Sequence, residues 1–213
     1  MNVFIIYAHP EPMSFDHRLK IHAVETLKQQ GHAVQVSDLY DMRFKAVVDT
    51  QDFMAPADDT YFNLRTEQLN ASLNRTFSED IIEEQAKIIW AEMLIFQFPL
   101  WWYSFPAIMK GWVDRVLTYG FAYGMGRSLN RKRAMLVITT GGPVRTFTPE
   151  LQESVSAMLD HIQRGVLHVC GISVLPPFAV YGASSTSNEQ KERILVQYTQ
   201  VLTVLDRIAP LEF

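Results

Sequence analysis

The chain is poor in cysteine, which limits how it can be stabilised. Cys170 is the one cysteine among 213 residues, so the chain can form no intramolecular disulfide and has no CxxC pair to bind a metal. This usage fits a reducing compartment, and we expect a cytoplasmic location rather than secretion. The apolar N-terminus, residues 2–8, has no basic flank and no small-residue cleavage site, so a buried strand explains it better than a signal peptide.

Several motifs of known catalytic chemistry are also missing. No GxGxxG follows the first predicted strand and no GxxxxGK(S/T) occurs, which argues against a dinucleotide-binding Rossmann half and against a P-loop. There is no GxSxG nucleophile elbow, and the 6 histidines show neither HExxH nor i,i+4 pairing. We therefore expect neither a serine hydrolase of that type nor a protein metal site.

Clustered basic charge and long apolar runs are scarce as well. Lys and Arg number 19 against 23 Asp and Glu, a net charge of −4, and the basic residues are scattered apart from residues 131–133. Because no basic stripe could follow a phosphate backbone, nucleic acid is a poor candidate partner. The longest apolar stretch, residues 93–109, is broken by polar residues and prolines and is shorter than the ~20 residues of a membrane span. We expect no membrane insertion.

What the chain does have is a regular alternation of strand-length apolar runs with segments of helical periodicity. Such alternation predicts right-handed βαβ crossovers and a parallel sheet covered on both faces. We predict one α/β domain over residues 1–213, a doubly wound five-stranded parallel sheet in the order 2-1-3-4-5. The predicted strands are residues 3–9, 33–40, 93–99, 134–142 and 171–181, and the predicted helices are residues 16–30, 78–90, 106–117, 149–169 and 188–207.

One long segment, residues 41–77, carries little periodicity between the second predicted strand and the helix that begins near Ser78. We call it the excursion. Loops longer than about 12–15 residues inside a compact domain are usually functional or disordered. We therefore expect the excursion to cover a site or a subunit contact.

The topology predicts where a ligand binds. In sheets of this order, ligands lie at the carboxyl ends of the strands, beside the switch point between strands one and three, which here means residues 9–18, 99–105 and 139–147. The middle segment carries four aromatic residues where ordinary loops are polar. Either a neighbouring subunit buries this loop, or it is a platform for a flat conjugated ligand. The four are Trp101, Trp102, Tyr103 and Phe105.

The other two segments favour a flavin as that ligand. The glycine pair at 141–142 would let the backbone approach a planar ring closely, and the threonine pair at 139–140 offers hydroxyls and amides to its polar edge. The first segment leads into a helix N-terminus, where free amides favour an anion such as a flavin phosphate, and His9 and Arg18 could add charge. Taken alone, His9 would be a strand-end histidine bonded to the backbone.

Six motifs follow one another along nearly the whole chain: AHPEPMSF (8–15), SDLYDMRFKAVV (37–48), FQFPLWWYSFPAIMKGWVDRV (96–116), FAYG (121–124), ITTGG (138–142) and GVLHVCGISVLPP (165–177). In these motifs and their order, the chain resembles the flavodoxin-like NAD(P)H:quinone oxidoreductases, the family of DT-diaphorase. Bacterial members of that family include quinone reductases, drug-activity modulators and potassium-efflux ancillary proteins.

The resemblance implies a homodimer that uses NAD(P)H to reduce quinones by two electrons, in ping-pong hydride transfer through bound FAD. FMN is the less favoured cofactor. The substrate pocket is expected at Trp102, Tyr103, Tyr123 and Phe147, with Tyr123 coming from the second subunit. The FAD-binding branch often has a glutamine at the position of Asn63. It also has an arginine, near the diphosphate of the cofactor, close to the position of Lys191. The cofactor-binding positions implied are His9, Phe15, Asp16, His17, Asn63, Pro99, Leu100, Trp101, Trp102, Tyr103, Thr139, Thr140, Gly141, Gly142 and Lys191.

The chain departs from the mammalian pattern after the TTGG motif. Mammalian members have a tyrosine and a downstream histidine there that relay a proton to the reduced flavin, whereas here Phe147 is the nearest aromatic residue and no histidine precedes His161. A phenylalanine cannot donate a proton, so either water or another group stabilises the reduced flavin, or the hydride step is slower. The alternative function is an ancillary regulatory flavoprotein that docks on a membrane transporter. A one-electron carrier is less favoured, because carriers usually present a strongly acidic face.

Overall fold

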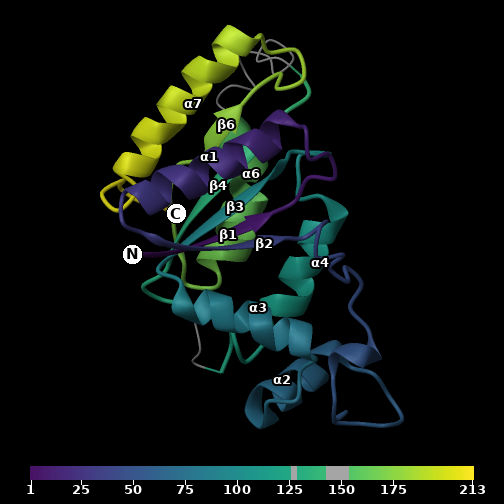
Figure 1. The fold of residues 1–213 in the computed structure, drawn as a ribbon. Coiled ribbons are helices and arrows are strands. Elements are labelled where there is room, and N and C mark those ends of the chain that lie inside the picture. Colours follow the sequence, from purple (N-terminus) through teal and green to yellow (C-terminus); the bar gives the residue numbers. More distant parts are fainter. Residues whose placement is uncertain (126–128, 143–153) are drawn as a thin grey trace.

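The computed structural model describes residues 1–125, 129–142 and 154–213 (Figure 1). Strands and helices alternate along the chain, as the sequence predicts. The strands are β1 (Asn2–Tyr7), β2 (Ala33–Asp38), β3 (Met93–Pro99), β4 (Arg133–Thr139), β5 (Ser173–Val174) and β6 (Phe178–Val180). The helices are α1 (Phe15–Gln29), the short 3-10 turn Thr50–Asp52, α2 (Leu64–Asn74), α3 (Glu79–Trp90), α4 (Ala107–Val116), α6 (Ser154–Ile162) and α7 (Asn188–Thr203).

The strands form one parallel sheet in the order β2-β1-β3-β4-β5, with β6 also paired to β4. This confirms the predicted order. The predicted fifth strand is divided, because Ser173–Val174 and Phe178–Val180 pair separately with β4 on either side of Pro176 and Pro177. A proline has no N–H to donate to the ladder, so two in succession interrupt the pairing.

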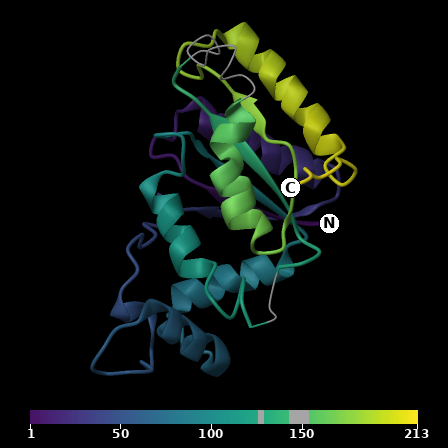
Figure 2. The same ribbon diagram turned by 180° about the vertical axis from the view of Figure 1, so that it is seen from behind.

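The sheet is buried on both faces, as its near-continuous apolar strands predict. Phe4 and Ile6 of β1 face a core that includes residues of α3, α4 and α6, whereas Val3 and Ile5 face a core built with α1 and α7. Figure 2 shows α4 and α6 lying across the face of the sheet opposite to α1 and α7. Cys170 belongs to the first core, and burial raises the pKa of its thiol to about 11, which fits a small core residue.

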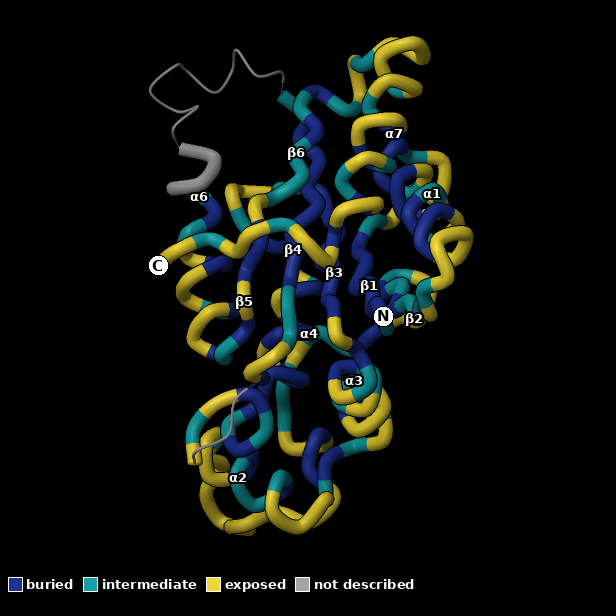
Figure 3. Tube along the Cα trace, turned by 90° about the vertical axis from the view of Figure 1, so that its left-hand side faces the viewer, coloured by how far each residue is buried: buried dark blue, intermediate teal, exposed yellow. Residues whose placement is uncertain are grey.

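The excursion contains structure that the sequence did not reveal. Helix α2 and the turn Thr50–Asp52 lie beyond α3, on the side of the sheet away from α1 and α7 (Figures 1 and 3). A small core of its own holds it together, made by Phe53, Ala71, Phe77 and Ile81. The residues that α2 buries are mostly polar, so the helix has no apolar stripe to recognise.

Several predicted element ends differ from the observed ones. Ser78 occupies the position before α3, but its hydroxyl donates to the Asp80 carboxylate at 2.6 Å instead of accepting from a first-turn amide. Residues 149–153 of the predicted helix 149–169 lie outside the described residues, and the rest is seen as α6 followed by a π-helical turn, Gln163–His168. Among the helices that the structure describes, none is both long and apolar enough to cross a membrane.

Candidate functional site

A pocket of about 370 Å³ opens at the carboxyl ends of β1, β3 and β4. This is the edge of the sheet at which the topology places a ligand. Three loops that the sequence singles out meet there, joined by the segment before α7 and by one residue of α7 itself. The lining consists of His9, Met13, Ser14, Phe15, Asp16, Pro99, Leu100, Trp101, Thr139, Thr140, Gly141, Ala183, Ser184 and Lys191.

The loop after β1 presents a helix N-terminus to this pocket. The Ser14 hydroxyl caps α1 by accepting from the His17 amide at 3.0 Å, which leaves the amides of Phe15 and Asp16 with no partner in the described chain. His9 Nδ1 accepts from the Glu11 amide at 3.0 Å, so the strand-end role considered for it is real. The same bond places any ring proton of a neutral His9 on Nε2. Two amides and one imidazole nitrogen therefore remain for a ligand.

The aromatic loop after β3 is a tight turn held in an unfavourable backbone conformation. The Ser104 amide donates to the Trp101 carbonyl at 3.0 Å, and the two residues between them have left-handed φ angles, 51° at Trp102 and 57° at Tyr103. Glycine or asparagine usually occupies such positions, because a side chain there costs energy. Trp102 is 95% exposed in the single chain. None of the described residues covers this side chain, which is what both readings of the loop require, cover by a second subunit or by a flat ligand.

The floor of the pocket contains a buried carboxylate, Asp16, which is 2% exposed. Its Oδ1 accepts from Gln97 Nε2 at 2.6 Å and its Oδ2 accepts from the Thr139 hydroxyl at 2.9 Å. Burial raises the pKa of Asp16, although these two hydrogen bonds and the charges of His9 and Lys20 oppose the rise. Lys20 is itself paired with Asp38 at 2.8 Å.

Gln97 is a site-building residue that the sequence reasoning missed. It is fully buried in β3, and its amide also donates to the Asp16 backbone carbonyl at 2.6 Å. Its Oε1 is buried with no partner. The signal was available, since Gln97 is the one polar residue in the strand MLIFQFP.

The β4 loop differs in one respect from its predicted role. The Thr139 hydroxyl donates to Asp16, and the Thr140 hydroxyl donates to the Gly142 carbonyl at 2.7 Å, so both protons are engaged within the chain. Their carbonyls and the Thr140 amide are engaged within the chain as well, so these two residues offer a ligand mainly the remaining lone pairs of their oxygens. At Gly141, a Cβ would meet no atom within 4 Å, which means that the backbone borders open space there.

These features together fit a flavin. The open space beside Gly141 would accept a flat ring against the backbone, and Trp101 supplies an aromatic wall. The free amides of Phe15 and Asp16 suit a phosphate, with Lys191 on the same lining as a positive charge. Among the described residues, no three His, Cys, Asp or Glu side chains are grouped to hold a metal ion.

The remaining predicted positions are not on this pocket of the single chain. His17 lines a neighbouring pocket of about 520 Å³ with Lys20, and burial lowers the pKa of its imidazole. Tyr123 packs edge-on against Tyr119, with ring centroids 5.6 Å apart. Phe147 lies outside the described residues. Trp102, Tyr103 and Gly142 adjoin lining residues in sequence without lining the pocket themselves.

Asn63 lies in the excursion, apart from the other predicted residues. Its Oδ1 accepts from the Thr66 amide at 3.1 Å and caps α2. A separate pocket of about 400 Å³ lies in the excursion, walled by aromatic and acidic side chains that include Phe53, Phe62 and Glu67. Several pockets of similar volume are present among the described residues, and the one at the ends of β1, β3 and β4 combines the three loops predicted to bind a cofactor.

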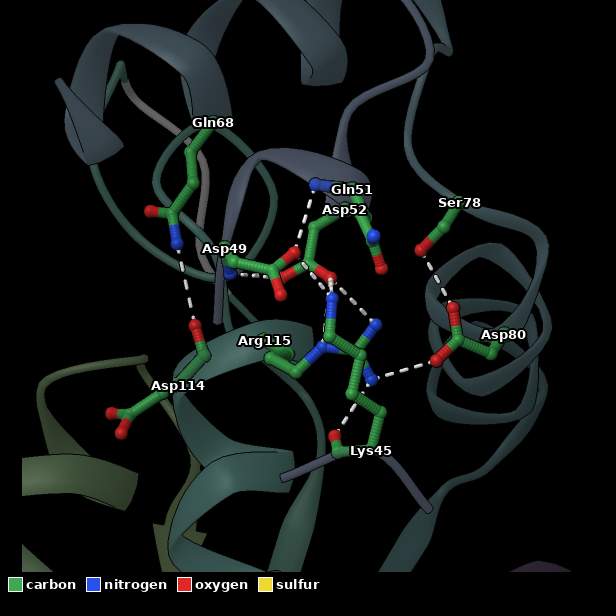
Figure 4. A network of polar contacts seen from close by, with 9 residues as sticks. All are labelled: Lys45, Asp49, Gln51, Asp52, Gln68, Ser78, Asp80, Asp114 and Arg115. Atoms are coloured by element: carbon green, nitrogen blue, oxygen red, sulfur yellow. Dashed lines mark hydrogen bonds and ion pairs between the residues drawn. The ribbon is translucent and has the colours of Figure 1, made fainter. Parts of the chain in front are cut away.

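A buried ionic network holds the excursion against the domain (Figure 4). The guanidinium of Arg115, on α4, donates to Asp52 Oδ1 at 2.9 and 3.1 Å and to Asp80 Oδ2 at 2.6 Å. Lys45 Nζ also donates to Asp52, at 2.9 Å. Burial alone would raise the pKa of Asp80, but the hydrogen bonds from Arg115 and Ser78 outweigh it and lower that pKa. The network fastens the excursion to both α3 and α4.

Comparison with known proteins identifies relatives that match nearly the full chain. A family model described as flavodoxin-like fold matches residues 1–203. The ribosyldihydronicotinamide dehydrogenase (quinone) of Mus musculus is 39% identical over 216 positions, which cover 98% of this chain and 94% of that protein. The NAD(P)H dehydrogenase (quinone) 1 of Cavia porcellus is 38% identical and covers 98% of this chain and 78% of its own. A candidate quinone reductase from Klebsiella pneumoniae, of known crystal structure, superposes with a TM-score of 0.96 at 41% identity, over 100% of this chain and 88% of that one.

Proposed function

The chain belongs to the flavodoxin-like fold family, and from its pocket and its relatives we propose that it is a flavin-dependent NAD(P)H:quinone oxidoreductase. The observation that carries the proposal is the pocket at the ends of β1, β3 and β4. It joins free helix amides, a glycine-lined opening and an aromatic wall in a chain whose relatives are named as quinone dehydrogenases.

The protein's own residues would bind, orient and shield the cofactor. The amides of Phe15 and Asp16, with Lys191, would bind its phosphate, and Trp101 would cover one part of its ring. The flavin, when bound, supplies the capacity to accept a hydride from a reduced nicotinamide and to deliver two electrons to a quinone. The aromatic loop would keep water from the reacting face.

We expect donor and acceptor to use the same space in turn. The aromatic loop and the β4 loop border one pocket of about 370 Å³, which has little room for two flat reactants beside a flavin. Initial rates measured against donor at several quinone concentrations should therefore give parallel lines. Intersecting lines at all concentrations would indicate two separate pockets.

A homodimer is part of the proposal. Trp102, Tyr103 and Tyr123 are exposed in the single chain, and a patch of this kind usually marks an interface. A second copy would cover them and could bring Tyr123 to the substrate. Sedimentation velocity should give a dimer that retains flavin, whereas a stable monomer with bound flavin would exclude this part.

We also propose FAD rather than FMN as the cofactor. An ordered excursion of this length costs conformational entropy, which contact with the adenine half of FAD or with a second subunit would offset. Because Asn63 is absent from the pocket of its own chain, its contribution would have to be made to the site of a second copy. Lys191→Glu should weaken FAD retention more than FMN retention, with salt softening the loss. An unchanged FAD affinity would remove Lys191 from the site.

One measurement tests the core of the proposal: the visible spectrum of the purified protein, with mass analysis of the cofactor released on heating. The rates of quinone reduction with NADH, NADPH and ribosyldihydronicotinamide should be measured next, because the two relatives are named for different hydride donors. A flavin spectrum with quinone turnover supports the reductase. Bound flavin without turnover, together with co-purification of a membrane protein, would favour the ancillary regulatory alternative.

A further inference from the structure

The carboxylate of Asp16 is buried and, among the residues that the structure describes, has no ion-pair partner, although it lines the pocket. Both of its oxygens accept hydrogen bonds from neutral groups, the Gln97 amide and the Thr139 hydroxyl. Neutral donors recover part of the hydration that a carboxylate loses on burial, but they supply no opposite charge. The charge of Asp16 is therefore poorly compensated compared with that of other carboxylates in this chain.

The charges of His9 and Lys20 act on Asp16 from nearby and oppose the rise of its pKa, but neither group forms an ion pair with it among the described residues. From α1, Lys20 pairs with Asp38, and from the β1 loop, His9 uses Nδ1 to accept from the Glu11 amide. Tyr7 of β1 and Tyr198 of α7 face the site, and burial raises the pKa of both phenols, so both stay neutral. Lys191 lies on the same lining and points its charge toward the ring of Phe15, 5.7 Å from the centroid.

A second negative charge at this place would be next to the first. The amides suited to a phosphate belong to Phe15 and to Asp16 itself, so an anion on them lies within the same helical turn as the carboxyl group. A second negative charge at short range disfavours the ionised form of the carboxyl, which is the group that a proton can neutralise. The surrounding bonds permit it, because the Thr139 hydroxyl can rotate from donating to accepting.

We propose that Asp16 takes up a proton from solvent when the flavin phosphate binds at the N-terminus of α1, so that the carboxyl is neutral in the complex. This inference rests on the proposed function. It makes cofactor binding proton-linked: affinity for a flavin phosphate falls as pH rises, while affinity for riboflavin, which has no phosphate, does not.

The test is calorimetric titration of the full-length chain, freed of flavin, with FAD and with riboflavin. FAD is the better probe because its diphosphate has no group that titrates near neutral pH, whereas a phosphate monoester has a pKa of about 6. Titrations in two buffers of different ionisation enthalpy measure the protons taken up, and repeating them from about pH 5.5 to about pH 8.5 gives the slope of affinity, at most about tenfold per pH unit. Asp16→Asn keeps the size of the side chain and removes the charge, and Asp41→Asn, at an exposed position near the same loop, controls for net charge.

We expect proton uptake with FAD but not with riboflavin in the wild type and in Asp41→Asn, and none with either ligand in Asp16→Asn. FAD binding without proton uptake, or an equal pH slope in Asp16→Asn, overturns the inference while leaving the proposed function intact. If neither FAD nor FMN binds at any pH, the proposed function fails and this inference fails with it. Should Asp16→Asn not fold, the contrast between FAD and riboflavin in the wild type decides the question.

Discussion

Two carboxylates in this protein are almost fully buried but differ in the charge of the groups that donate hydrogen bonds to them. Asp52, in the excursion, is 1% exposed and accepts from both Arg115 and Lys45, while Asp16, in the pocket floor, is 2% exposed and accepts from neutral donors. The first is satisfied entirely by its own chain and serves to fasten one segment to another. The second has a charge that its neutral hydrogen-bond donors compensate only in part, and it lies beside the pocket opening. The contrast separates a structural carboxylate from one that is set to respond to a ligand.

The two regions should also respond to pH with opposite signs. Asp80, in the excursion network, has a lowered pKa, so its pairing stabilises the fold above the unfolded-state pKa of about 4 and is lost as pH falls through the folded-state value. Asp16 has a raised pKa, so the folded chain is most stable at low pH with respect to this group. That stability declines as pH rises from about 4 to the folded-state pKa.

The largest expected effect comes from breaking the excursion network at Arg115. Arg115→Ala leaves Asp80 without its cation and the buried Asp52 with Lys45 alone, and should lower the free energy of unfolding by about 3 kcal/mol. Urea unfolding at neutral pH measures it. Arg115→Lys keeps the charge but has fewer hydrogen-bond donors, so its free energy of unfolding should lie between those of the wild type and Arg115→Ala. A loss under about 0.5 kcal/mol for Arg115→Ala would mean that the network contributes nothing net.

Packing supplies the next effect in the same region. A Cβ on Gly111 of α4 would lie 2.1 Å from the Ala46 carbonyl oxygen, so Gly111→Ala must push the start of the excursion off the helix. We expect a loss of about 1–3 kcal/mol in unfolding free energy. Gly165→Ala is the matched control, because a Cβ there meets nothing within 4 Å. Equal effects of the two substitutions would show that the contact with residue 46 is unimportant.

Asp16→Asn and Asp52→Asn test whether the two buried carboxylates affect stability in opposite directions. Removing a poorly compensated buried charge should raise the unfolding free energy of the flavin-free protein by about 1–3 kcal/mol at alkaline pH and reduce its decline with rising pH. Asp52→Asn, which leaves Arg115 short of a partner, should lower it instead. Thermal or urea unfolding at several pH values measures both changes. If the two substitutions changed the unfolding free energy in the same direction, the two carboxylates would not differ in their effect on stability.

The smallest effect is expected at the aromatic turn. Tyr103→Gly relieves a left-handed conformation but raises the conformational entropy of the unfolded chain, and the two effects oppose each other. The free energy of unfolding should therefore increase by no more than about 1 kcal/mol. The KM for quinone should nevertheless rise, because the substrate pocket proposed to include Tyr103 loses an aromatic side chain. Tyr61→Gly, at an exposed position without a left-handed φ, should destabilise slightly and leave that KM unchanged. A lower stability for Tyr103→Gly than for Tyr61→Gly would mean that the turn is not strained.

Local patterns were enough to predict most of the framework. Continuous apolar runs predict β1, β3 and β4, which are buried on both faces, and the alternating residues of β2 predict a strand near the edge of the sheet. The strand order and the sheet edge that binds a ligand follow from the alternation with helices. The loop residues Phe15, Trp101 and Gly141 were predicted to meet there, and they do. Helix α2 was missed because it buries polar side chains and therefore shows no apolar period.

The layers of this protein follow from its sequence alone, because the period of apolar residues shows which face of each element is buried. It could not determine which polar groups meet inside. Asp16 and Gln97 are 81 positions apart, and Arg115 and Asp52 are 63 apart, so nothing local marks them as partners. The pairing of Asp52 with a cation, and of Asp16 with neutral donors, depends on the tertiary structure. The charge state of a buried group is set by the groups that the fold places within a few ångströms of it.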